Sequence, residues 1–340
     1  MKLNYEYNIC DDANTEIETF TTFESINKIF YLIYINEENS IISYDLINKQ
    51  IITIIGNSHS DDITSIKHYL DDIDNRDLIM TCSINELKIW NIKNYHIICE
   101  LKQPLKPNCL IKYNNKYYIV SAFENYPILI YDLEGNIFKQ IKNEYCINNL
   151  CSFNDQENSY LITLNDLSMC SYKNFTFYKK YKEEYRKYSC PCCNGYKNVE
   201  DMIDHSNGTP LKCLFYKKDN GNIQLIESNT DYDHGDYYIK VWDFHSAGPD
   251  LVNKIYLYDI NDICLINNNK LLVGYGELIK IVYLDIIDEK GEFKEEQIEV
   301  IKGMNKSEDE NYSFLKIDHP SLGECLIWKI ENIINLFSLK

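Results

Sequence analysis

The stretch Tyr238-Ile239-Lys240-Val241-Trp242-Asp243-Phe244-His245 decides how this chain folds. Apolar and polar residues alternate along it, which is typical of a β-strand with one buried face. A strand of this kind that ends in Trp-Asp is typical of the third strand of a repeated four-stranded unit. If the unit is repeated, a large apolar residue should recur at the position of Trp242, which is called the slot below.

The slot recurs six times in the rest of the chain, filled by Tyr44, Trp90, Tyr131, Tyr172, Val282 and Phe337. The seven slots are separated by 46, 41, 41, 70, 40 and 55 residues. Four of these intervals lie near the period of roughly 40–45 residues of one four-stranded propeller blade, and the two long ones require insertions. The sequence therefore predicts an all-β fold, a seven-bladed β-propeller with four-stranded antiparallel blades.

A single domain, residues 1–340, is expected, because a repeat along the chain is a stronger guide to the number of domains than the chain length. The blades are predicted at 15–56, 59–103, 107–142, 146–182, 211–258, 260–302 and 312–340, with an insertion at 182–210. The fourth strand of blade 6 is expected at Gln297–Ile301. Blade 7 leaves no room for a fourth strand, and residues 3–9 form an isolated alternating run. We therefore predict that residues 3–9 pair with Ile333–Ser338 and close the ring.

Blade 2 shows a pattern of four polar and aromatic residues. His59 precedes its first strand, Ser83 ends the second, Asn85 lies in the turn to the third and Trp90 fills the slot. In this pattern, and in Trp242-Asp243, the chain resembles the WD40-repeat family. The resemblance implies that Ser83, His59 and Asn85 supply a hydrogen-bond acceptor for the buried Trp90 N–H. The bias toward Ile, Asn, Lys and Tyr indicates an A+T-rich genome, as in a unicellular eukaryote.

The slots without tryptophan should not need such a histidine. The hydroxyls of Tyr44, Tyr131 and Tyr172 can reach partners of their own. Val282 and Phe337 carry no donor at all. We therefore expect the histidine to be absent from these blades.

Acidic residues dominate the charge. There are 52 Asp and Glu against 34 Lys and Arg, a formal net charge of −18. The averaged field repels phosphate backbones and anionic headgroups, so neither nucleic acid nor a membrane is an expected partner. Met1–Ala13 has no apolar signal segment, and the longest apolar run, Ile29–Ile35, is too short to span a bilayer. We expect a cytoplasmic or nuclear protein whose 13 cysteines are thiols.

The segment from Cys190 to Cys213 contains residue types that ligate metals. Cys190 and Cys193 have C-x₂-C spacing and His205 follows, which partly imitates a zinc finger. A second histidine is missing, and a structural zinc site is normally tetrahedral. We therefore expect no metal, and Cys190, Cys193, His205 and Cys213 are the residues that a metal analysis would test.

Known catalytic motifs are missing from the sequence. It contains no G-x-S-x-G, H-E-x-x-H or P-loop pattern. We therefore predict a non-catalytic scaffold that needs no cofactor and binds a protein or peptide. Two alternatives stay open: a hydrolase or lyase with a site in the central channel, and the substrate receptor of a ubiquitin ligase. The W-D-x-R box of such receptors is absent, since Trp242-Asp243-Phe244 is followed by His245.

The binding surface is predicted on the loops that join second to third strands and fourth strands to the next blade, because these gather on one face of a propeller. Tyrosine offers a large contact area at low entropic cost, and carboxylates orient a basic partner. We expect this face to bind a Lys/Arg-bearing segment in a salt-sensitive way. The predicted contacts are Asp61, Asp62, Glu86, Glu124, Tyr126, Asp166, Asp231, Tyr232, Asp233, His234, Tyr275 and Glu277.

Overall fold

A computed structural model describes residues 3–11, 17–36, 38–103, 108–122, 127–143, 147, 149–155, 158–164, 168–182, 210–218, 223–231, 236–245, 248–258, 260–267, 269–275, 278–287, 293–297, 312–330 and 333–339. The regular structure of these residues is entirely β. None of them belongs to a helix long and apolar enough to cross a membrane. The chain divides into two compact units, Met1–Asn143 with Ile298–Lys340, and Glu144–Gln297.

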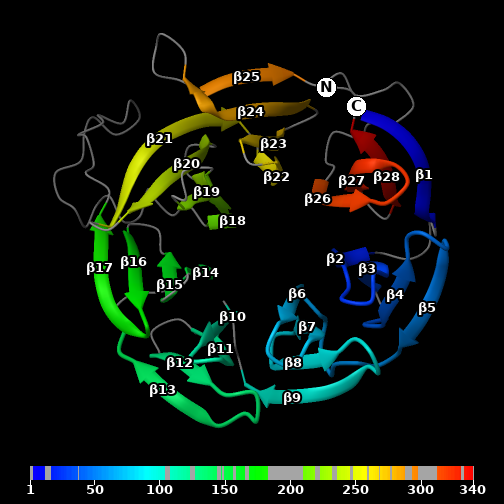
Figure 1. Cartoon of the computed structure of the whole chain (residues 1–340), viewed down its shortest axis with the longest axis horizontal. Coiled ribbons are helices and arrows are strands. Elements are labelled where there is room, and N and C mark those ends of the chain that lie inside the picture. The colour runs from blue at the N-terminus through cyan, green and yellow to red at the C-terminus, as the bar shows by residue number, and fades with distance from the viewer. Residues whose placement is uncertain are drawn as a thin grey trace. The chain divides into compact units, whose positions relative to one another are not determined.

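The first unit contains four four-stranded antiparallel sheets (Figure 1). Blade 1 consists of β2 (Ile17–Glu24), β3 (Phe30–Asn36), β4 (Ile41–Asp45) and β5 (Gln50–Ile55). Blade 2 consists of β6 (Ser65–Asp71), β7 (Arg76–Cys82), β8 (Glu86–Asn91) and β9 (His96–Lys102). Blade 3 consists of β10 (Asn108–Tyr113), β11 (Lys116–Ser121), β12 (Ile128–Tyr131) and β13 (Ile137–Ile141). Blade 7 consists of β26 (Tyr312–His319), β27 (Gly323–Ile330), β28 (Ile333–Leu339) and, from the other end of the chain, β1 (Leu3–Asp11).

The second unit contains three sheets of the same design. Blade 4 consists of β14 (Asn149–Asn154), β15 (Ser159–Leu164), β16 (Ser168–Lys173) and β17 (Thr176–Lys182). Blade 5 consists of β18 (Pro210–Lys217), β19 (Ile223–Asp231), β20 (Asp236–His245) and β21 (Gly248–Tyr258). Blade 6 consists of β22 (Ile260–Asn267), β23 (Lys270–Tyr275), β24 (Leu278–Ile287) and β25 (Phe293–Gln297).

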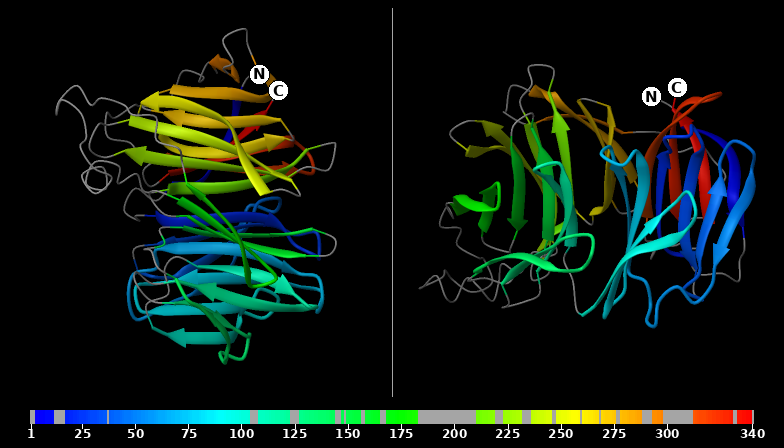
Figure 2. Two further views of the ribbon diagram at one scale, coloured as in Figure 1. Left: turned by 90° about the vertical axis from the view of Figure 1, so that its left-hand side faces the viewer. Right: turned by 60° about the horizontal axis from the view of Figure 1, so that its bottom comes forward.

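Within each unit, neighbouring blades meet through their first strands. β2 contacts both β6 and β26, and β18 contacts both β14 and β22. The strands of each blade lie antiparallel and side by side (Figure 2). Burial falls toward the fourth strand: β3 is buried along its whole length, whereas every residue of β5 is exposed or half-buried. Burial of the apolar inner strands therefore stabilises the sheets, at roughly 25 cal/mol for each Å² of apolar surface removed from water.

The slot has the same geometry in successive blades. In blades 1 to 5 a β-bulge in the fourth strand lies opposite the slot residue. A bulge increases the local twist of a strand pair and is therefore a defined structural feature. Its recurrence shows that the slots are equivalent positions. The buried slot residues are Trp90, Tyr131, Tyr172, Trp242, Val282 and Phe337, and Tyr44 is half-buried.

The N-terminal strand completes blade 7. β1 pairs antiparallel with β28 along its length. The hydroxyl of Tyr7 in β1 donates to the backbone oxygen of Leu46 in blade 1, at 2.9 Å, and the ammonium of Lys49 lies 3.7 Å from the centre of the Tyr7 ring. The predicted pairing of residues 3–9 with β28 is therefore confirmed, and the observed strand extends to Asp11.

The fourth strand of blade 6 was predicted at the wrong place. The strand that pairs with β24 is Phe293–Gln297, whereas the expected Gln297–Ile301 lies outside the described residues beyond Gln297. Three successive residues of β25, Lys294, Glu295 and Glu296, are exposed. A strand at the edge of a sheet tolerates charges on both faces, so its sequence does not alternate.

Candidate functional site

Three loops meet at one end of blade 2: the β3–β4 connection, the β5–β6 connection and the β7–β8 turn. Asn39 joins the first two, because its Nδ2 donates to Asp62 Oδ1 at 3.0 Å and its Oδ1 accepts the N–H of Ile63 at 3.0 Å. Asn85 joins the third, because its Nδ2 donates to Asp61 Oδ2 at 3.0 Å. Asn85 thus binds a surface carboxylate rather than the tryptophan network that the WD40 resemblance implies for it.

Beneath these loops Thr81 connects two buried rings. The Trp90 indole Nε1–H donates to Thr81 Oγ1 at 2.8 Å, and His59 Nε2 lies 2.8 Å from the same oxygen. All three side chains are buried. The expectation that Ser83 is the acceptor is wrong, because Ser83 Oγ accepts the N–H of Glu86 in the β7–β8 turn at 3.1 Å. Thr81 takes the place that was assigned to Ser83.

The hydrogen bonds of Thr81 indicate how His59 is protonated. The Thr81 oxygen accepts from the indole, which leaves its own hydrogen for His59 Nε2. The ring proton then lies on Nδ1, 3.4 Å from Glu86 Oε2. Burial, together with repulsion from the Lys88 ammonium, lowers the pKa of His59 from 6.5 to about 4. His59 is therefore neutral at pH 7, and its contact with Glu86 is not an ion pair.

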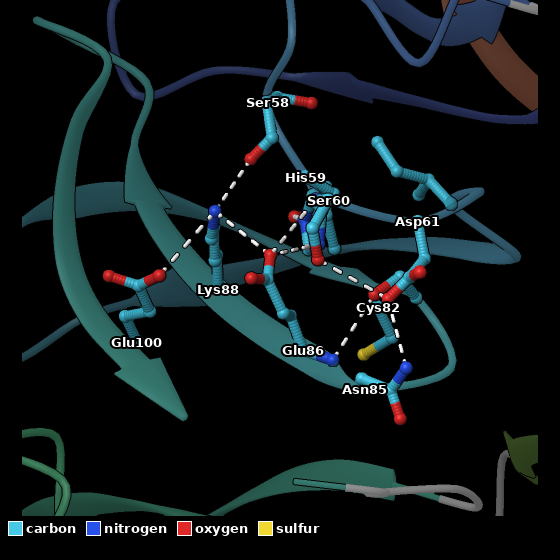
Figure 3. A network of polar contacts seen from close by, with 12 residues as sticks. Ser58, His59, Ser60, Asp61, Cys82, Asn85, Glu86, Lys88 and Glu100 are labelled. Atoms are coloured by element: carbon cyan, nitrogen blue, oxygen red, sulfur yellow. Dashed lines mark hydrogen bonds and ion pairs between the residues drawn. The ribbon is translucent and has the colours of Figure 1, made fainter. Parts of the chain in front are cut away.

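Lys88 compensates the carboxylate of Glu86 (Figure 3). Its Nζ lies 3.1 Å from Glu86 Oε2, 3.6 Å from Glu100 Oε1 and 2.7 Å from the backbone oxygen of Ser58. The side chains of Lys88 and Glu86 are each only 11% exposed. Burial opposes ionisation of Glu86, but the hydrogen bonds from Lys88 and Ser60 and the charge of Lys88 together outweigh it and hold the pKa of Glu86 below its ordinary value. Glu86, predicted as a partner contact, therefore faces inward and stabilises the blade.

The carboxylates of Asp61 and Asp62 reach the surface. Asp61 is half-buried and Asp62 is exposed. Asp61 Oδ2 accepts from the Ser60 hydroxyl, at 3.2 Å, as well as from Asn85. In the described part of the chain the partners of both carboxylates are amides and a hydroxyl, and none is a cation. Ile84, at the tip of the β7–β8 turn, is 61% exposed. Asp61, Asp62 and Ile84 are called the blade 2 face below.

Most of the other predicted contacts lie outside the described residues. Asp231 and Tyr275 are the last residues of β19 and β23, at the ends where these strands turn into the next. Cys213, the last of the metal candidates, lies in β18. Among the described residues, no group of three His, Cys, Asp or Glu side chains could hold a metal ion. Outside the described residues lie Glu124, Tyr126, Asp166, Tyr232, Asp233, His234, Glu277, Cys190, Cys193 and His205.

Two other blades place a hydrogen-bond partner of the slot residue at the position of Thr81. Trp242 Nε1 donates to Glu227 Oε2 at 3.1 Å, and the Tyr172 hydroxyl bonds the side chain of Thr163. In each blade the partner lies in the second strand, two residues beyond the residue paired with the slot. Sequence reasoning missed these partners, although counting two residues along the second strand would have found them.

The seven four-stranded blades define a β-propeller, and solved structures share this fold. No protein-family model matches the chain, and no curated protein matches it. Two of the similar solved structures are crystals of BBS1N in complex with ARL6DN, one soaked with lead and one with mercury. Each matches with a TM-score of 0.64 and 10% identity, over 99% of this chain and 97% of the matched chain. The predicted seven-bladed fold is therefore confirmed, whereas membership of the WD40-repeat family stays a prediction.

Proposed function

We propose that the chain is a non-catalytic platform that binds a Lys/Arg-bearing segment of another protein at the blade 2 face. One observation carries the proposal. Asp61 and Asp62 have no cation among their described partners, whereas the adjacent Glu86 is compensated by Lys88. A basic segment would supply the missing positive charge.

The blade 2 face combines the features that protein recognition requires. Surface carboxylates speed association with a basic partner and fix its orientation. The exposed Ile84 side chain supplies apolar area beside them. The buried Thr81 and Lys88 networks hold the loops in place, which lowers the entropy lost on binding.

The similar solved structures support a protein as the class of partner. BBS1N was crystallised in complex with ARL6DN, and the matched chain shares the propeller fold at 10% identity. A fold hosts many functions, so the match supports the class of partner and not its identity. The predicted contacts that lie outside the described residues belong to the same proposal.

Differential capture from a lysate tests this site. The face variant combines Asp61→Asn, Asp62→Asn and Ile84→Ser, and it keeps acceptors for Asn85 and Asn39. The matched control changes the β6–β7 hairpin at the opposite end of the same blade, by Asp72→Asn, Asp74→Asn and Ile73→Ser. The control removes the same residue types, and its Ile73 is also exposed, by 42%. It differs from the face variant in that Asp72 and Asp74 form ion pairs with Lys112 and Arg76.

Quantitative mass spectrometry then compares the three baits. We expect proteins that wild type and control capture equally and that the face variant loses by about 10-fold or more, which corresponds to about 1.4 kcal/mol. Circular dichroism and thermal melting should be unchanged in both variants. A face variant that captures the same proteins as wild type would contradict the proposal, as would the absence of any specifically captured protein.

The competing function, a hydrolase or lyase with a site in the central channel, stays a hypothesis. It predicts turnover by the purified chain, whereas a platform predicts none. A screen against generic ester, glycoside and phosphate substrates separates the two. Enzymatic activity that co-elutes with the purified chain in chromatography would overturn the non-catalytic part of the proposal.

A further inference from the structure

The fourth strands differ in how they protect their free edges. An exposed strand edge is a template for pairing with another strand, and proteins usually block it with charged residues. As the structure bounds them, six of the seven fourth strands carry charges, for example Glu6 in β1, Glu100 in β9 and Lys139 in β13. β5, Gln50-Ile51-Ile52-Thr53-Ile54-Ile55, carries none. Figure 1 shows β5 at the edge of its sheet.

Exposed apolar residues opposite the slot occur in several blades. Ile51, opposite Tyr44, is 51% exposed, and the equivalent Ile97 and Ile137 are 43% and 52% exposed. These residues lie directly opposite the slot residue on the neighbouring strand. They therefore do not distinguish β5 from the other fourth strands.

Ile54 does distinguish β5. It lies opposite Ile42, two residues before the slot, and is 59% exposed. A polar residue occupies this position in every other blade, so an exposed isoleucine is an exception within the chain's own repeat. An apolar edge strand without charges is a template on which another strand can add. The equivalent residues are Asn8, Glu100, Gln140, Lys180, Lys254 and Gln297.

The sequence of β5 is symmetric about its centre. Ile-Ile-Thr-Ile-Ile reads the same in both directions around Thr53. A twofold axis at Thr53 would pair two antiparallel copies with Ile51 opposite Ile55 and Ile52 opposite Ile54, as an isologous interface requires. The flanking Lys49 would lie opposite Asn57, so no like charges would face each other.

We propose that β5 is a homodimer interface, in which two copies of the chain add their β5 edges antiparallel about Thr53. The pairing joins the four-stranded sheets of the two copies into one continuous sheet across the twofold axis, and it covers Ile54. One strand pair buries less than the roughly 1,200 Å² of a standard stable interface. Each copy also carries a net charge of −18. The dimer is therefore weak, and it strengthens as salt screens the repulsion.

Sedimentation velocity of the full chain over a concentration series tests this interface. We expect the weight-average sedimentation coefficient of wild type to rise with concentration, and to rise further at high salt. Ile54→Lys should remain monomeric, because it places at this position a charge, as three of the other blades do. The matched control Ile97→Lys, at another exposed isoleucine on a fourth strand (43% against 59% for Ile54), should dimerise like wild type. Circular dichroism confirms that both variants fold.

A disulfide across the twofold axis tests the register. Position 53 would face its own copy, and directly opposite residues of antiparallel strands lie within the roughly 4.4–6.8 Å Cα separation that a disulfide spans. Thr53→Cys should therefore give a cross-linked dimer with oxidised glutathione, mapped by mass spectrometry to position 53 of both copies. Ile51→Cys should not cross-link to its own copy, because it faces position 55.

Three results would overturn the proposal. These are a wild-type chain that stays monomeric at high concentration and high salt, a dimer that Ile54→Lys leaves intact, and cross-links that do not involve position 53. The blade 2 face lies outside β5, in the β5–β6 connection and the β7–β8 turn, and is tested by protein capture. A monomeric chain would therefore leave that proposal standing.

Discussion

Thr81 is the residue on which the interior of blade 2 depends. Its oxygen accepts the indole N–H of Trp90 while it contacts His59, so one hydroxyl satisfies groups on two buried rings. Threonine suits this place because its methyl group packs in a strand while its hydroxyl bonds. Asp61 and Asp62 follow His59 by two and three residues in the β5–β6 connection.

Thr81→Val should lower the free energy of unfolding by about 1–3 kcal/mol, because it leaves a buried indole donor without an acceptor in a side chain of nearly the same shape. Urea unfolding followed by tryptophan fluorescence measures the change. Thr64→Val is the matched control, since Thr64 is exposed and its hydroxyl makes a longer bond of 3.3 Å; it should change stability by less than about 0.5 kcal/mol. Equal losses in both variants would contradict the role given to Thr81.

His59 should make stability depend on pH. Its pKa is about 4 when folded, below the value of 6.5 of an ordinary histidine. The unfolded chain binds the proton more readily, so the stabilisation is fully present above pH 6.5 and is lost as pH falls toward 4. The loss approaches about 1.4 kcal/mol for each pH unit in this window. His59→Gln should show a shallower fall in unfolding free energy between pH 6.5 and 4, and identical slopes would contradict the buried neutral ring.

Individual residues were only partly predictable from sequence. Trp90 and His59 could be found because an indole needs an acceptor. Thr81 was missed in favour of Ser83, since the two are equally polar and only the register of β7 against β8 tells which faces the indole. Glu86 resembled Asp61 and Asp62 as a loop carboxylate. Lys88 lies two residues further on the same face of β8, and this spacing was the available sign that Glu86 is compensated.

The strand β1 is the element that links the two ends of the chain. It supplies the outer edge of blade 7, and its Tyr7 reaches the backbone of Leu46 in blade 1. Leu3 is buried, and Tyr7 and Ile9 pack on the apolar cluster that blades 7 and 1 share. Without β1, this cluster and the edge of β28 would both meet water.

Deletion of residues 1–10 should lower the melting temperature or cause aggregation, because it removes a complete ladder from β28. Differential scanning calorimetry and light scattering measure both outcomes. Tyr7→Phe is a milder companion variant that removes only the hydroxyl bound to Leu46, at a cost of about 1 kcal/mol. A truncated chain that melts like wild type without aggregating would contradict the closure by β1.

Elements were predictable where one face of a strand is buried. β1 and β20 alternate clearly, and both were found. β25, Phe-Lys-Glu-Glu-Gln, was missed because an edge strand exposed on both faces has no reason to alternate. Its Lys294, Glu295 and Glu296 resemble a charged loop until the pairing with β24 is known.

For the whole molecule, the repeat determined the fold and the charge restricted the partner. Seven slots predicted seven blades, because each blade can bury its faces only against neighbouring blades. The binding face could be predicted only as a class of loops, because a partner is recognised by side-chain geometry that repeat spacing does not encode. Asp61 and Asp62 could be predicted as acidic loop residues, but their lack of a described cation became visible only in the structure.

Hydrogen exchange of the chain, free and bound to the protein that wild type captures, tests the binding face most directly. The amides of 56–64 and 83–86 should exchange more slowly in the complex, because a bound segment would cover Asp61, Asp62 and Ile84. Raising the salt concentration should weaken this protection together with binding. Protection confined to the β6–β7 hairpin, or to β5, with the exchange of 56–64 and 83–86 unchanged, would contradict binding at the blade 2 face.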